Sequence, residues 1–543
     1  MRVLVISLLR LGDFIQILPV LQALKEQHSI LELDVLTHSP VKQLAPMVDS
    51  VHRWFTLDRD ELQAGLGRAD LPLLTSFSVL KEQVDTIDRR GYDCIINLTQ
   101  TVYSGWIAGY LSTSQRYGLA IDAKGQAQFH SAWFQYLDEH APLSVDDVFH
   151  YTDIFHYGCG LKNTERKWIL RETRHGRAEA EALQIQGEEK IVLQTLTSDS
   201  KKTWPEESWV QMLSQLRLFR PKAQFIALGA PSEEIRIDGL LELAMQKGVT
   251  IKKAIVSLEG AFSLLRSASL LITGDTSIKH LANATGVPIL ELSLGSSDYR
   301  RTGAYRAGSL ILQPAVACSP CPHSAPCSRA THECAAGIAP DAVSAAAHHH
   351  LSGDWLSLRE LAREYDRELK FLRTRNLSNG FWLASDVIES HPERAIEKII
   401  ERCTWKFLLN REHLEPIAKF GSEGINMRRE LESLFPGTVL SCYSQHLGFL
   451  ETQVESFAEK AASLLSTVSR RAPAVDDIKE FFKLHQPHST ALTWLESAPS
   501  SAEDPTAIGG LRRMHNQLES CYQRAQVKKK MIRSLKSQLM ELK

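Results

Sequence analysis

Continuous apolar runs alternate with helically spaced apolar positions along the N-terminal part of the chain. Val3–Leu9 is a continuous stretch that is apolar except at Ser7, which predicts a strand buried on both faces. Apolar residues at helical spacing follow it over 15–25. Further strands are predicted at 31–38 and 93–99, with helix-like stretches between them. Strands that alternate with helices predict a parallel sheet covered by helices on both faces.

The same alternation restarts near residue 190, after a polar connection at 171–190. Further strands are predicted at 190–196, 224–230, 269–275 and 288–294. The chain therefore divides into two Rossmann-like α/β halves, 1–170 and 190–345. Such pairs bind ligands in the cleft between them, at the carboxyl ends of the strands.

Helical periodicity dominates beyond about residue 355, and strand signals fade. We expect a helical extension over 355–497, a linker at 498–510 and one basic amphipathic helix at 511–543. That helix carries a heptad-like apolar seam, and its nine Lys and Arg against two Glu give a net charge of +7. It could pair with a second copy, lie on an anionic membrane or pack on its own chain.

The composition of the whole chain limits the classes of function. A net charge of −2 over 543 residues gives no indication of nucleic-acid binding. Arg10 and Asp13 interrupt the first apolar run, so we do not expect a signal peptide. No run approaches the roughly 18–20 apolar residues of a membrane helix. We therefore expect a cytoplasmic protein, with at most peripheral contact at the inner face of the cytoplasmic membrane.

The turn after the first predicted strand places a glycine before an aspartate. Gly12 lets the backbone pass close to a ligand, and Asp13 lies at or near the start of a helix. Asp13 is either a helix cap or a general base that takes a proton from an acceptor hydroxyl in the cleft.

Two later strand-to-helix turns are suited to bind phosphate. Thr197, Ser198 and Lys202 follow the strand at 190–196, and the lysine can neutralise charge on a departing diphosphate. A solvated loop is the alternative. After the strand at 269–275, free backbone N–H groups at Thr276 and Ser277 would point at an anion. His280 follows one turn later, where a packing role is more common than a chemical one.

Four segments, in order and spacing, resemble the lipopolysaccharide ADP-heptose heptosyltransferases of glycosyltransferase family 9. They are LRLGDFIQILPVLQALK (9–25), KTWPEESW (202–209), GDTSIKHLANATGVPILEL (274–292) and GSSDYRRTGAY (295–305). The resemblance covers roughly residues 1–345. It implies a GT-B fold, a nucleotide-sugar donor such as ADP-heptose, and an inverting reaction that needs no catalytic metal.

The same resemblance implies roles for individual residues. Asp13 would be the general base, and Lys202 would stabilise the diphosphate. The implied donor-binding residues are Gly12, Thr197, Ser198, Glu233, Asp275, Thr276, Ser277 and His280. Ser277 stands where the family usually has glycine, and a serine is strained there only if the position requires a positive φ.

Three interpretations of function follow. The first is transfer of heptose from ADP-heptose to lipopolysaccharide core or a related surface glycan. In the second, the acceptor is a surface protein. The third is a GT-B module that binds without turnover, against which the retained Asp13 and Lys202 argue.

Four of the nine cysteines cluster within 318–334. Cys318, Cys321, Cys327 and Cys334 form a C-x2-C-x5-C-x6-C pattern. In a reducing compartment this pattern predicts a structural zinc or iron site, with four unligated thiols as the alternative. His323 and His332 are alternative ligands.

Overall fold

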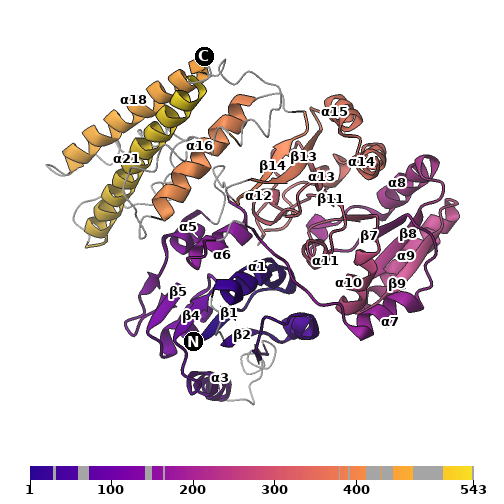
Figure 1. Cartoon of the computed structure of the whole chain (residues 1–543), viewed down its shortest axis with the longest axis horizontal. Coiled ribbons are helices and arrows are strands. Elements are labelled where there is room, and N and C mark those ends of the chain that lie inside the picture. Colours follow the sequence, from indigo (N-terminus) through magenta and orange to yellow (C-terminus); the bar gives the residue numbers. More distant parts are fainter. Residues whose placement is uncertain are drawn as a thin grey trace. The chain divides into compact units, whose positions relative to one another are not determined.

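The computed structural model describes residues 1–27, 32–58, 73–140, 149–162, 165–323, 325–377, 380–388, 392–410, 429, 444–468 and 505–540. The chain forms two compact units (Figure 1). The first unit comprises Met1–Gln135 and Phe149–Glu389, and the second comprises Tyr136–Val148 and Ser390–Lys543.

A six-stranded sheet forms the N-terminal half of the first unit, in the order β3-β2-β1-β4-β5-β6. Its strands are β1 (Arg2–Ser7), β2 (Glu32–His38), β3 (Arg53–Leu57), β4 (Cys94–Asn97), β5 (Gln115–Ile121) and β6 (Ala127–Phe129). The strand β1 pairs in parallel with β2 and β4, and only its first residue is exposed. This is the burial that the continuous apolar run predicts.

An eight-stranded sheet forms the other half, in the order β14-β13-β12-β11-β10-β7-β8-β9. Its strands are β7 (Lys190–Gln194), β8 (Gln224–Gly229), β9 (Ile251–Ile255), β10 (Leu270–Thr273), β11 (Ile289–Leu292), β12 (Leu310–Pro314), β13 (Leu369–Asn376) and β14 (Trp382–Asp386). The strands from β7 to β12 pair in parallel. The predicted pair of doubly wound α/β halves is therefore confirmed.

Helices connect the strands and lie against both sheets (Figure 1). They are α1 (Leu11–Gln27), η1 (Ser39–Met47), α3 (Leu73–Asp88), α4 (Val102–Tyr110), α5 (Ala132–His140), α6 (Tyr151–Gly158), α7 (Arg174–Ala182), η2 (Ser200–Lys202), α8 (Glu206–Phe219), η3 (Pro231–Glu233), α9 (Glu234–Gln246), α10 (Leu258–Arg266), α11 (Ser277–Ala282), α12 (Tyr299–Thr302), α13 (Glu333–Ala336), α14 (Pro340–Ser352) and α15 (Trp355–Glu364). The helix α1 follows β1 directly, and α11 follows β10.

The second sheet extends further along the chain than the sequence predicts. We expected helices alone beyond residue 355, yet β13 and β14 add two antiparallel strands beside β12. In the sequence of β13, apolar and basic residues are interspersed, so the strand signal is weak. Trp382 of β14 is almost completely buried, and its indole N–H donates to Ala304 O. Packing and the pairing of β13 with β12, rather than local propensity, therefore determine the secondary structure of this region.

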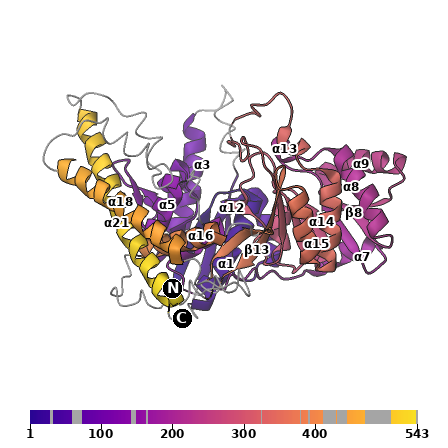
Figure 2. The same cartoon turned by 90° about the horizontal axis from the view of Figure 1, so that it is seen from above.

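Three helices make up the described part of the extension in the second unit: α16 (Pro392–Leu409), α18 (Ser444–Val468) and α21 (Pro505–Met540). The helix α21 packs along α18 and also contacts α16 (Figure 2). On α21, Met531, Ile532, Leu535 and Leu539 are completely buried. Of the linker expected at 498–510, residues 505–510 instead belong to α21, and 498–504 lie outside the described residues.

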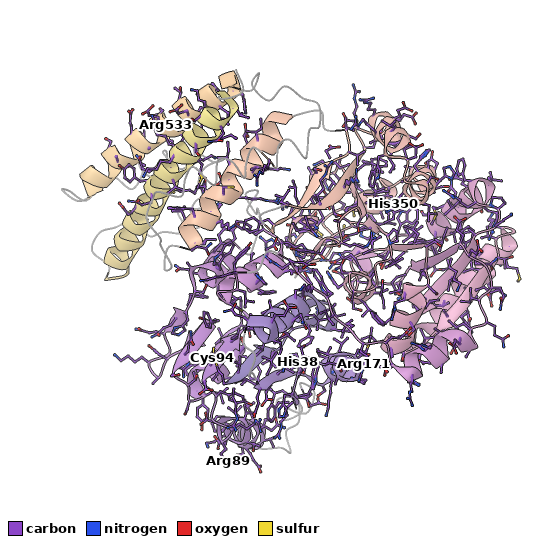
Figure 3. All side chains as sticks on the ribbon, in the orientation of Figure 1. His38, Arg89, Cys94, Arg171, His350 and Arg533 are labelled. Carbon is purple, nitrogen blue, oxygen red and sulfur yellow. The ribbon has the colours of Figure 1, made fainter. Side chains whose placement is uncertain are left out.

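The basic residues of α21 pair with glutamates of its own chain. Lys528 Nζ lies 2.7 Å from Glu401 Oε2 on α16. Arg533, labelled in Figure 3, pairs with Glu451 of α18. Among the three alternatives for 511–543, the structure therefore shows the helix packed on its own chain. None of the described helices has both the length and the apolar character required to cross a bilayer.

Candidate active site

The turn after β1 meets the turn after β10 inside the first unit. A Cβ atom built on Gly12 would lie 3.2 Å from His280 Cδ2 and 3.4 Å from Ser277 Cα. A side chain at residue 12 would therefore push α1 away from α11, and this close approach is a physical reason for glycine there. Gly12 thus lies against α11, which belongs to the C-terminal half of the first unit.

This approach places two carboxylates near each other. Asp13 lies in the first turn of α1 and is only partly exposed. Burial, followed by the negative charge of Asp275, raises the pKa of Asp13, although Arg10 and Lys202 oppose the shift. A raised pKa brings a carboxylate closer to working pH, where it is a more effective proton acceptor.

Asp275 has the opposite environment, because each of its oxygens binds a lysine. Lys202 Nζ lies 2.6 Å from Asp275 Oδ2, and Lys279 Nζ lies 2.6 Å from Asp275 Oδ1. Burial alone would raise the pKa of Asp275, but these two ammonium groups lower it well below its usual value. Asp275 therefore stays ionised at any working pH.

The ion pairs continue into the core. Lys279 Nζ lies 2.8 Å from Glu291 Oε1 on β11, and both side chains are completely inaccessible to solvent. The other oxygen, Oε2, accepts a hydrogen bond of 2.7 Å from Ala304 N. Neither Lys279 nor Glu291 was expected from the sequence to belong to the site. Their signal was a charge in the apolar run 288–294 and a lysine at a helix position that faces the core.

The loop predicted to bind phosphate is held by its own hydroxyl groups. Thr197 Oγ1 donates to Asp199 O over 2.7 Å and shares a hydrogen bond of 2.8 Å with Thr203 Oγ1. Asp199 in turn accepts from Lys201 N over 3.0 Å at the start of η2. Ser198 is exposed at this loop. The conformation of the loop is thus fixed by its own hydrogen bonds, and Ser198 lies exposed on it.

Two adjacent lysines at the end of this loop have different tasks. Lys202 reaches Asp275, whereas Lys201 Nζ donates to three backbone carbonyls. These acceptors are Pro322 O at 2.9 Å, His323 O at 3.1 Å and Ala325 O at 2.6 Å. Lys201 therefore fixes the cysteine-containing segment beside the loop, whereas Lys202 binds Asp275.

The first turn of α11 settles the question about Ser277. Thr276 is the N-cap, and its hydroxyl accepts from Lys279 N over 3.3 Å. Ser277 begins the helix, and its φ is not positive, so serine is unstrained where glycine was expected. His280 Nε2 lies 3.7 Å from Asp275 Oδ1. Burial lowers the pKa of His280 well below its usual value, so the ring is neutral.

Glu233 lies after β8, and its carboxylate accepts from Ala230 N over 2.8 Å. The strands β7, β8 and β10 run in parallel, so their carboxyl ends share one edge of the sheet. Thr197, Glu233 and Asp275 all follow these ends. This is the edge at which open α/β sheets bind ligands.

The four cysteines are gathered but not arranged as ligands. Cys334 is buried, Cys318 and Cys321 are partly buried, and Cys327 is exposed. Burial raises the pKa of Cys334, and the neighbouring Cys318 and Cys327 add to the shift. Within the described residues, no three His, Cys, Asp or Glu side chains are placed so that they could hold a metal ion. The predicted zinc or iron site is therefore unsupported by this structure.

Residues 83–329 match the family described as glycosyltransferase family 9 (heptosyltransferase). Over this stretch, which is less than half of the chain, the protein is similar to the family 9 glycosyltransferases. Lipopolysaccharide heptosyltransferase 1 of Pseudomonas aeruginosa is 23% identical to it over 339 residues, which are 59% of this chain and 86% of that protein. The enzyme of the same name from Escherichia coli is 22% identical over 311 residues, which are 57% of this chain and 91% of that protein.

A solved structure supports the fold of this glycosyltransferase. The family 9 glycosyltransferase of Veillonella parvula superposes with a TM-score of 0.50 at 17% identity, over 65% of this chain and 97% of that one. The GT-B class implied by the sequence resemblance is confirmed.

Proposed function

We propose that this glycosyltransferase moves heptose from ADP-heptose to lipopolysaccharide core or a related surface glycan, on the cytoplasmic side of the inner membrane. The observation that carries the proposal is the meeting of Asp13 with the Asp275–Lys202 pair where α1 packs against α11. The two relatives named above are lipopolysaccharide heptosyltransferases, which supports this choice of sugar and acceptor.

On the donor side, the proposed site is the edge formed by the ends of β7, β8 and β10. Thr197, Ser198 and the turn at Thr276 would hold the diphosphate, and Glu233 would lie toward the nucleoside. As the bond between the sugar carbon and the phosphate oxygen breaks, its electron pair moves to the diphosphate. The ammonium group of Lys202 stabilises this growing negative charge.

On the acceptor side, Asp13 takes the proton of the attacking hydroxyl. The hydroxyl oxygen forms its bond to the anomeric carbon from the face opposite the departing diphosphate, so the configuration inverts. The proton ends on the Asp13 carboxylate, and the raised pKa of this group favours that transfer. In this scheme lysine and backbone N–H groups do the work that a divalent ion does elsewhere.

Incubation of the purified protein with a panel of nucleotide sugars tests the proposal. We expect release of ADP from ADP-heptose, and an increase when extracted lipopolysaccharide is added. Release that depends on an added protein instead would identify the acceptor as a surface protein. Binding of ADP-heptose without release under any condition would leave a non-catalytic binding module and contradict the proposal.

The four-cysteine segment has no chemical step in this proposal. Its spacing predicts a bound zinc or iron, but no group of three possible ligands among the described residues is placed to hold an ion. Elemental analysis of the purified protein decides between these alternatives. About one ion per chain, lost in a Cys318→Ser/Cys321→Ser variant, would establish the site, and metal-free protein of unchanged stability would remove it.

A further inference from the structure

Four charged side chains form a continuous row from the candidate active site into the core. The row runs Lys202–Asp275–Lys279–Glu291, with successive N···O distances of 2.6, 2.6 and 2.8 Å. The side chains of Lys202 and Asp275 are each 10% exposed, whereas those of Lys279 and Glu291 are 0% exposed. We call this row the buried ion chain. The proposed reaction uses only its first member, Lys202.

The two lysines on Asp275 differ in how firmly they are held. Lys279 belongs to α11 and binds two carboxylates at once. Its deeper partner, Glu291, is fixed by β11 and by the hydrogen bond from Ala304 N. Lys202 ends the short turn η2, and within the described part of the chain its ammonium group pairs with one carboxylate, that of Asp275. Lys202 is therefore the member that can exchange one anionic partner for another.

We propose that Lys279, held in place by Glu291, is a positioning residue that keeps Asp275 neutralised while Lys202 leaves it for the donor diphosphate. This inference rests on the proposed function. Lys202 binds either Asp275 or the diphosphate, and the exchange is easy only if Asp275 retains a second cation. Without Lys279, departure of Lys202 would leave a buried carboxylate unpaired, which is strongly unfavourable.

The surroundings of Asp275 strengthen this requirement. With both lysines bound, Asp275 is ionised, because the two ammonium groups hold its pKa well below the usual value. The neighbouring His280 is neutral, so it does not replace a missing cation. Asp13 adds a second negative charge nearby, partly balanced by Arg10. Lys279 is therefore the cation that remains next to Asp275 when Lys202 moves.

Glu291 has a role separate from that of Lys279, and this role predicts the direction in which a substitution of Glu291 changes stability and donor binding. Both of its oxygens accept hydrogen bonds, from Lys279 Nζ and from Ala304 N, which suits a carboxylate. Within the buried ion chain, the Glu291 carboxylate binds Lys279 and is not directly paired with Asp275 or Lys202. Loss of the Glu291 charge should therefore weaken folding without tightening the hold of Asp275 on Lys202.

Three variants separate positioning from a merely structural role. Lys279→Met removes the cation at similar length, Glu291→Gln removes only its counter-charge, and Lys279→Met/Glu291→Gln restores the charge balance of the buried ion chain. ADP affinity is measured by titration calorimetry, the donor KM and kcat by ADP release, and folding by thermal unfolding. Lys279→Arg, which keeps the charge, serves as the conservative control.

We expect Lys279→Met to weaken ADP binding and raise the donor KM by about tenfold or more, as for loss of a charge-assisted contact. Glu291→Gln should lower the Tm without raising the donor KM. The double variant should recover most of the Tm but keep the weak ADP binding, because Lys202 is still the only cation on Asp275. This variant keeps the test decisive even if Lys279→Met alone fails to fold.

Recovery of ADP affinity together with Tm in the double variant would overturn the inference, and so would wild-type ADP affinity in a folded Lys279→Met protein. Either result would leave the proposed function intact, provided that the wild type binds ADP and releases it from ADP-heptose. A wild type that neither binds ADP nor releases it would contradict the proposed function itself, and this inference with it.

Discussion

The turns after β1 and β10 are similar in local structure, but their aspartates lie in opposite electrostatic environments. Each follows a buried strand and carries an aspartate at the start of a helix, Asp13 in one and Asp275 in the other. Burial and a neighbouring carboxylate raise the pKa of Asp13, whereas two lysines lower that of Asp275. One aspartate is thus prepared to accept a proton, and the other serves as a permanent anion.

This difference shows that the local motif does not decide the chemistry. Both turns place a carboxylate at the carboxyl end of a parallel strand. The two lysines on Asp275 distinguish them: Lys202 comes from a distant loop, and Lys279 lies four residues after Asp275 on α11. Two carboxylates whose environments push their pKa values apart form the pattern from which acid–base roles are assigned in enzymes. The predictions below test this contrast.

The largest expected effect comes from removal of the proton acceptor. Asp13→Asn keeps the shape of the side chain but cannot take the acceptor proton. We expect kcat to fall by roughly 10²–10⁴, the usual range for loss of a general base. ADP affinity should be nearly unchanged, because Lys202 still reaches the donor. Steady-state ADP release and calorimetry measure the two quantities, and turnover close to wild type would exclude Asp13 from the mechanism.

A somewhat smaller loss is expected on the donor side. Lys202→Ala removes the charge that stabilises the departing diphosphate, so kcat/KM for the donor should fall by about 10²–10³. EDTA should leave the activity of the wild type unchanged. Strict dependence on added magnesium would show that a divalent ion, rather than Lys202, supports the diphosphate.

The anionic state of Asp275 predicts a dependence of stability on pH. Because its pKa is lowered in the folded protein, its contribution is complete above its usual pKa of 3.8 and is lost as the pH falls through the folded value. Asp275→Asn leaves two lysines facing a neutral group and should cost about 3–5 kcal/mol at neutral pH. The difference in unfolding free energy from the wild type should shrink on acidification. A difference that is constant with pH would contradict this assignment.

The smallest expected effect is a shift in the pH profile of activity. In the proposed mechanism Asp13 acts in its unprotonated form, so activity should fall on acidification through its raised pKa, above the usual value of 3.8. Asp275→Asn removes one cause of the raised pKa, so the acid limb of kcat/KM should move to lower pH in that variant. An acid limb at the same pH in the wild type and in Asp275→Asn would show that the charge of Asp275 does not affect the pKa of Asp13.

Much of the framework could be predicted from the sequence because its signals are local. Mainly apolar segments identified β1, β7, β8 and β10, and the polar turns that follow them identified Asp13, Lys202 and Asp275. Family resemblance then assigned these turns to a donor and an acceptor side. The meeting of α1 with α11, which brings the turns together, is a tertiary contact and became visible only in the structure.

The rest could not be predicted because it depends on partners far apart in the sequence. Nothing local distinguishes Lys201, which binds carbonyls of residues 322–325, from Lys202, which binds Asp275. The pairing of Lys279 with Glu291 joins a helix to a strand, and each residue alone reads as an isolated charge. The apolar seam of the terminal helix could be recognised in the sequence. The helices of the same chain that cover it, α16 and α18, could not.

The central claim is that Asp13 and Lys202 together transfer heptose from ADP-heptose to a glycan. Its most direct test is mass spectrometry of a heptose-free lipopolysaccharide core incubated with ADP-heptose and the purified protein. The account predicts that the core gains the mass of one heptose for each ADP released, and that Asp13→Asn forms almost no product. An unmodified core, or equal product from Asp13→Asn, would contradict it.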